Sequence, residues 1–124
     1  MTLRQVHADF AWVVVLANAV VGTWALAAHH RERLRTRALW PATIVAEVTI
    51  VVEVALGAAL VALEDLEVAQ FHAFYGFVAL ATIGIVYSYR QQVAPHRFLL
   101  YGLGGLFLMG LAIRAMTISP IPVP

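Results

Sequence analysis

The sequence predicts an all-α fold, an up-down bundle of four transmembrane helices that forms a single domain over residues 1–124. The composition is the first reason. The chain is 62% hydrophobic and only 12% charged, with a mean hydropathy of +0.84, and one soluble core of this size could not bury so much apolar surface. The second reason is that the apolar residues gather in four runs, each close to the roughly 20 residues that a helix needs to cross a bilayer.

The four runs define the predicted helices in chain order. They cover residues 10–28, 42–63, 69–88 and 98–116. Pro41 directly precedes the second run, where a proline suits the first turn of a helix. Because the connections between the runs are short, consecutive helices should be antiparallel neighbours in the bundle.

The charges predict the orientation and exclude some partners. Six of the eight arginines lie in residues 29–37 and 90–97, two connections on the same side of the predicted bundle. The positive-inside rule places that side in the cytoplasm, so we expect both termini on the non-cytoplasmic side of a plasma (inner) membrane. The arginines form no single basic face, which argues against nucleic acid as a partner. The absence of cysteine excludes disulfides and thiolate metal sites, and no metal-ion site is predicted.

Two histidines are the first candidates for chemistry. His7 lies at the outer end of the first helix, and His72 lies about two turns outward from the middle of the third. These helices are diagonal in an up-down bundle, and two imidazoles that meet across the diagonal could ligate a b-type haem. The alternative interpretation places His7 in headgroup water and has His72 donate to a neighbouring carbonyl or carboxylate.

The second predicted helix carries two glutamates inside its apolar run. Glu53 is near the middle and Glu47 is about two turns inward, at a depth where an unpaired carboxylate costs a few kcal/mol. Glu53 shares a face with Gly57 that should look into the bundle, whereas Glu47 points elsewhere. Both are candidate proton-handling groups, and Glu53 could also be a partner of a histidine or a quinone. The alternative is a neutral Glu53 bonded across a helix seam or against another subunit.

Arg114 and a set of small or polar residues complete the candidates. Arg114 lies about two turns outward from the middle of the fourth helix. It could reach a haem propionate or one of the acids Glu64, Asp65 and Glu67, and snorkelling to the outer interface is the favoured alternative. Four residues are predicted to act in helix packing: Asn18, Gly57, Gly76 and Gly105.

One part of the sequence resembles a known family. Residues 53–61 read Glu-Val-Ala-Leu-Gly-Ala-Ala-Leu-Val, and an outer connection and His72 follow them. This arrangement resembles the repeated half of haem A synthase-type membrane proteins. The resemblance implies a four-helix unit with His72 as a haem ligand. The chain has half the length of that family and a glutamate where the family usually has glutamine, so the resemblance does not imply haem A synthesis.

Three functions are compatible with these residues. The favoured one is a non-catalytic accessory subunit of a larger, respiratory membrane complex, in contact with other membrane subunits or with further copies of itself. The second is a b-type haem-binding electron carrier or quinone-interacting anchor that uses His7 and His72. The third is a proton-coupled carrier with Glu53 in its path.

Overall fold

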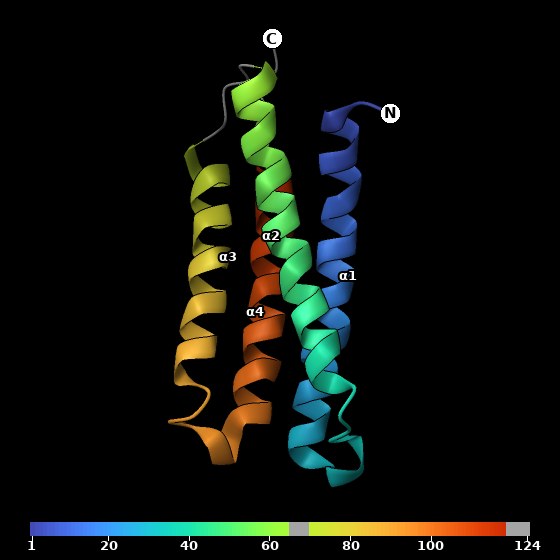
Figure 1. Cartoon of the computed structure of the whole chain (residues 1–124), viewed down its shortest axis with the longest axis vertical. Helices are drawn as coiled ribbons and strands as arrows, with labels where there is room; N and C mark the ends of the chain where they lie inside the picture. The colour runs from blue at the N-terminus through green and yellow to red at the C-terminus, as the bar shows by residue number, and fades with distance from the viewer. Residues whose placement is uncertain (65–69, 119–124) are drawn as a thin grey trace.

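The computed structural model describes residues 1–64 and 70–118 and confirms the predicted all-α bundle. Its four long helices are α1 (Leu3–His30), α2 (Leu39–Glu64), α3 (Gln70–Tyr89) and α4 (Arg97–Thr117). Short 3₁₀ turns, Glu32–Leu34 and Ala94–His96, lie in two of the connections. Consecutive helices are antiparallel, so α1 begins and α4 ends at the same end of the bundle (Figure 1).

The first helix begins earlier than its apolar run predicts because its N-terminus is capped. The Thr2 hydroxyl accepts from the Gln5 backbone amide at 3.1 Å, and the Gln5 side chain accepts from the Thr2 amide at 2.9 Å. This capping box satisfies two backbone donors that a helix start leaves without partners. The residues before the apolar run, His7 among them, therefore lie on the helix.

The four helices can each cross a bilayer. They contain 28, 26, 20 and 21 residues, and at about 1.5 Å per residue even the shortest spans roughly 30 Å. Their outward faces carry large apolar side chains that water would disfavour. Among the exposed ones are Trp12, Leu16, Val20, Ile44, Val48, Phe74, Phe77, Ile85, Leu103 and Phe107.

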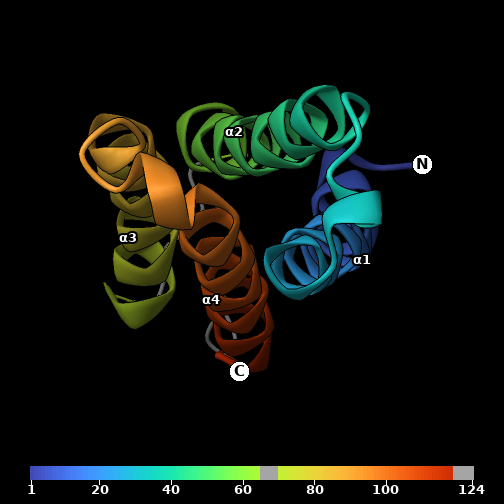
Figure 2. The ribbon, with the colours of Figure 1, turned by 90° about the horizontal axis from the view of Figure 1, so that it is seen from below.

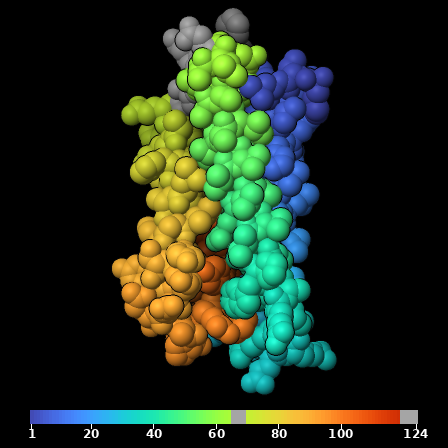
Figure 3. Space-filling model, viewed as in Figure 1, coloured from blue at the N-terminus to red at the C-terminus, as the bar shows by residue number. Residues whose placement is uncertain are grey.

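The helices follow one another around the bundle in chain order, but the contacts between neighbouring helices differ in extent. Helix α1 packs most extensively against α4 and then against α2, whereas α2 and α3 touch over a small area. Viewed along the bundle, α4 lies between α1 and α3 (Figure 2). In the space-filling view α4 is visible between α2 and the lower part of α3 (Figure 3). Helices α1 and α3 are thus diagonal, as predicted.

Glycines set the close approach of α1 and α4. A methyl group on Gly22 would lie 2.8 Å from the backbone nitrogen of Leu106, and one on Gly102 would lie 2.7 Å from that of Leu26. Gly105 faces Gly22, and a methyl group there would lie 2.8 Å from the Gly22 Cα. Distances this short leave no room for any side chain, so the two backbones are in direct contact.

A buried amide joins α1 to α2 at the middle of the bundle. Asn18 is 1% exposed, and its Nδ2 donates to the carbonyls of Val14 at 2.9 Å and Ala46 at 3.3 Å. Its Oδ1 has no hydrogen-bond partner among the described residues. An interhelical bond of this kind fixes the register of two apolar helices that could otherwise slide.

Candidate functional site

His7 and Glu53 form a hydrogen-bonded pair between α1 and α2. The second turn of α1 carries His7, and its Nδ1 lies 2.9 Å from Oε1 of Glu53, halfway along α2. The two side chains are 17% and 15% exposed. The partner explains how an apolar helix can hold a carboxylate at this depth, because a hydrogen bond from the ring N–H offsets part of its desolvation.

Gly57 makes room for the His7 ring. It lies one turn beyond Glu53 on α2, and a methyl group there would come within 3.2 Å of the His7 Cε1. The imidazole therefore lies against the α2 backbone with its Nδ1 on Glu53. The spacing of Glu53 and Gly57 on one helical face gives α2 both the hydrogen-bond partner and the space for the ring.

His72 is held by the end of another helix. It lies in the first turn of α3, and its Nδ1 is 2.9 Å from the carbonyl oxygen of Ala115. Ala115 belongs to the last turn of α4, where the backbone carbonyls accept no hydrogen bond from the helix itself. A carbonyl only accepts, so His72 donates to it through its Nδ1–H.

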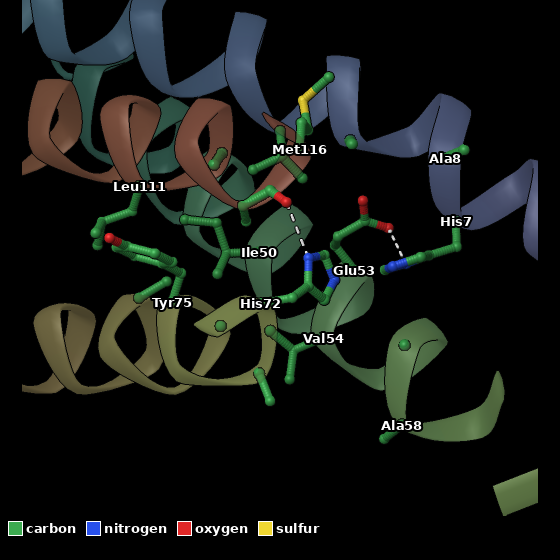
Figure 4. Close-up of a pocket in the computed structure, with 18 of the residues that line it drawn as sticks. His7, Ala8, Ile50, Glu53, Val54, Ala58, His72, Tyr75, Leu111 and Met116 are labelled. Atoms are coloured by element: carbon green, nitrogen blue, oxygen red, sulfur yellow. Dashed lines mark hydrogen bonds and ion pairs between the residues drawn. The ribbon is translucent and has the colours of Figure 1, made fainter. Parts of the chain in front are cut away.

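The two imidazoles meet across the diagonal of the bundle. Their ring centres are 6.1 Å apart and their planes are inclined by 81°. In the close-up, His7 and His72 point toward the same space from opposite helices, each with its Nδ1 tied to a partner (Figure 4). No hydrogen bond to either Nε2 occurs within the described residues, so both Nε2 atoms are available to a ligand.

A cavity of about 680 Å³ opens beside the histidines. This volume lies in the range of small-molecule and cofactor sites, which are mostly apolar with a few polar groups. All four helices contribute to the wall, which is mostly apolar. Residues that line it include Val14, Ile50, Val54, Gly57, Tyr75, Gly76, Ala79, Leu108 and Leu111. Arg4 and Asp9 stand at its edge with His7.

Several residues singled out from the sequence lie apart from this cavity. Arg114 is exposed on α4 and does not line it, while Arg4 does. Of the acids considered for Arg114, Glu64 is exposed, and Asp65 and Glu67 are outside the described residues. Glu47 is half-buried and away from the cavity, so the glutamates of α2 do not share a site.

The packing candidates divide between two places. Gly57 and Gly76 line the cavity. A methyl group on Gly76 would lie 3.9 Å from the Val54 side chain. Asn18 and Gly105 lie in the contacts of α1 with α2 and α4. The cavity residues Arg4 and Tyr75 are not predicted from the sequence. A signal for both exists, since each lies three residues from a candidate histidine and shares its helical face.

The cavity offers two imidazoles as nitrogen donors. No cluster of three histidine, cysteine or acidic side chains able to hold a metal occurs in the described residues. Two imidazoles suffice for a haem iron, which already has four nitrogen ligands. His7 and His72 offer such a pair at the cavity, with ring centres 6.1 Å apart.

No protein-family model, curated protein or solved structure matches this chain. The class of this protein is therefore inferred from its fold, and no family is assigned. The chain is a small four-span integral membrane protein, because its four helices have the length and hydrophobicity to cross a bilayer.

Proposed function

We propose that this protein is a b-type haem-binding membrane protein in which His7 and His72 would hold the haem. One observation supports the proposal above all. Each histidine occupies its Nδ1 with a partner and has no hydrogen bond to its Nε2 in the described residues, and the two ring centres are 6.1 Å apart with the planes inclined by 81°. Histidines that ligate metals usually donate their other ring nitrogen to a carboxylate or a backbone carbonyl. His7 and His72 have one partner of each kind.

The residues of the chain would divide the work at such a site. A haem bound there would supply one-electron transfer. His7 and His72 would hold it, and the apolar wall would exclude water. The hydrogen bond from the His7 ring to Glu53 would make that ring a more basic metal ligand. Arg4 lines the cavity and Arg114 does not, so Arg4 would be the arginine available to the carboxylates of such a group.

A visible absorption spectrum tests this proposal. The protein is purified in mild detergent from cells supplied with a haem precursor, and spectra are recorded before and after dithionite. We expect a Soret band that shifts on reduction and that is lost in His7→Ala and His72→Ala. His30→Ala is the matched control, because His30 lies at the opposite end of α1 and should leave the spectrum unchanged. Colourless protein, or a spectrum that is indifferent to both variants, would refute the proposal.

A second function, the accessory subunit of a larger membrane complex, has an observation of its own. Gly84 on α3 and Gly110 on α4 are exposed, and nothing lies within 4 Å of a methyl group built on either. Glycine costs a helix about 1 kcal/mol relative to alanine, and neither residue has a packing role within the described chain. A partner helix that approaches closely would give them one.

Copurification separates this function from the first. The tagged chain is extracted from its native membrane, and Gly84→Leu and Gly110→Leu are compared with the unchanged protein. Loss of stoichiometric larger subunits in the variants would support the accessory role, and loss of self-association would indicate copies of this chain. A homogeneous monomer in every sample would contradict it.

A further inference from the structure

The end of the bundle opposite His7, here called the arginine end, consists of residues 29–37 and 90–97. These two connections contain six arginines and a single acid, Glu32. The fold brings them together, because the rings of His29 and His96 are 6.2 Å apart although they belong to different connections. Residues of equal charge are thus concentrated at one end of the bundle, and Figure 2 views the ribbon from that end.

Arg35 is held in place without a carboxylate. Its Nε donates to the Ala28 carbonyl at 2.7 Å, and its Nη2 donates to the His29 carbonyl at 3.0 Å. These carbonyls are in the last turn of α1, where they lack partners within the helix. The guanidinium also lies 4.9 Å from the centre of the Phe98 ring. Backbone and ring therefore fix its position and leave its charge without a counterion.

Arg97 meets the same aromatic group from α4. Its guanidinium lies 5.2 Å from the centre of the Phe98 ring and 5.3 Å from that of Trp40. Phe98 is buried and stacks on Trp40 at 5.3 Å. Cation–π contacts of this kind orient a guanidinium at modest energy and do not neutralise it.

The guanidinium groups of Arg35 and Arg97 lie 4.9 and 5.2 Å from the centre of the same Phe98 ring. Neither Arg35 nor Arg97 forms a salt bridge with a carboxylate in the described residues. Both side chains are exposed, at the level where the apolar spans end and aromatic residues begin. An arrangement with two uncompensated cations and an aromatic floor at the membrane boundary is complementary to a phosphate that carries hydrocarbon chains.

We propose that Arg35 and Arg97 form a binding site for the phosphate headgroup of an anionic membrane lipid. The guanidinium groups bind the phosphate oxygens, and the glycerol and first methylenes lie along the half-buried Trp40. The site goes beyond a general attraction of basic loops to a membrane, because it assigns the contact to two arginines out of six. It does not depend on the proposed haem.

Nanodiscs of defined composition test the site. The full chain is placed in phosphatidylcholine alone or with added phosphatidylglycerol, and the retained lipid is quantified by native mass spectrometry. Arg97→Gln is compared with Arg33→Gln, a matched variant that removes the same charge from an exposed position of the same surface. We expect Arg97→Gln to weaken the preference for phosphatidylglycerol about fivefold, and Arg33→Gln to change it less than twofold.

Two more variants and a competition with phosphate separate a defined lipid site from diffuse attraction. Arg97→Lys keeps the charge but loses the planar fork, so it should recover only part of the preference. Arg35→Gln should weaken the preference as Arg97→Gln does. Because Arg35 also binds the last carbonyls of α1, the helix content of this variant is measured by circular dichroism. Equal losses in Arg97→Gln and Arg33→Gln would overturn the site in favour of diffuse charge. Displacement of the lipid by inorganic phosphate at equal concentration would overturn the assignment to a lipid.

Discussion

At the scale of single residues, the pairing of His7 with Glu53 determines how α1 meets α2 near the cavity. Each side chain is ionisable, and each lies in a helix that is mostly apolar. Their hydrogen bond of 2.9 Å offsets part of the desolvation cost of both side chains. Removal of either partner leaves the other without its bond in surroundings where water is scarce, so the two residues should be energetically coupled.

A double-mutant cycle measures this coupling. We expect His7→Ala and Glu53→Ala each to lower the free energy of unfolding in detergent by about 1–2 kcal/mol, and the double variant to lower it by less than the sum. The coupling free energy should be about 1 kcal/mol. Glu64→Ala, an exposed position of the same helix, is the control and should stay within about 0.5 kcal/mol. Strictly additive effects would show that the contact does not contribute.

Glu53 also allows the carrier hypothesis to be tested at the residue scale. Proton flux into liposomes is measured for the unchanged chain and for Glu53→Gln, which keeps the shape of the side chain but cannot take up or release a proton. A carrier with Glu53 in its path should lose at least tenfold of its flux, while Glu47→Gln tests whether the second glutamate of α2 takes part. Flux that survives Glu53→Gln unchanged would eliminate this role.

At the scale of the helices, the contact between α1 and α4 leaves no room for side chains at three glycines. Backbone lies against backbone at Gly22, Gly102 and Gly105. Gly110 occupies the same helix as Gly105 and faces open space. These two glycines of α4 therefore separate the effect of close packing from the effect of helix propensity.

Alanine at these two positions should act in opposite directions. Gly105→Ala places a methyl group 2.8 Å from the Gly22 Cα, and we expect it to destabilise the isolated chain by about 1–3 kcal/mol because the helices must move apart. Gly110→Ala meets nothing within 4 Å and should stabilise the chain by up to about 1 kcal/mol through helix propensity. Unfolding in a graded detergent series measures both. Equal effects of one sign would contradict the observed α1–α4 contact.

At the scale of the whole molecule, the bundle has two chemically different ends. One end carries His7, His72 and the cavity, and the other carries the arginines and a cluster of aromatic side chains. The sequence predicts that the arginine end faces the cytoplasm. The chain contains no cysteine, so a single introduced thiol reports the side of the membrane on which its position lies.

Labelling of single cysteines tests this orientation. We expect Thr2→Cys to react with a membrane-impermeant maleimide added to intact spheroplasts, because Thr2 is exposed at the His7 end. Thr36→Cys and Gln91→Cys, both exposed at the arginine end, should react only after the membrane is opened. The opposite pattern would invert the predicted topology, and labelling of all three positions in intact cells would contradict a four-span arrangement.

The parts of the candidate site differ in how far the sequence determines them. The apolar runs and the order of the helices suffice to put His7 and His72 on diagonal helices at similar depth, because an up-down bundle allows few arrangements. The partner of His72 could not be predicted in this way. It is a backbone carbonyl at the end of α4, and its availability depends on where that helix stops and how α3 lies beside it.

By itself, the sequence determined the class of this protein, the number of its helices and their antiparallel order, since hydrophobicity and span length are local properties of the chain. Tertiary structure decided which glycines meet, that Glu53 binds His7 while Glu47 lies elsewhere, and that Arg4 rather than Arg114 borders the cavity. The physical reason is the rotation of each helix about its axis. That rotation is set by contacts between residues far apart in the chain, which a pattern along one helix does not contain.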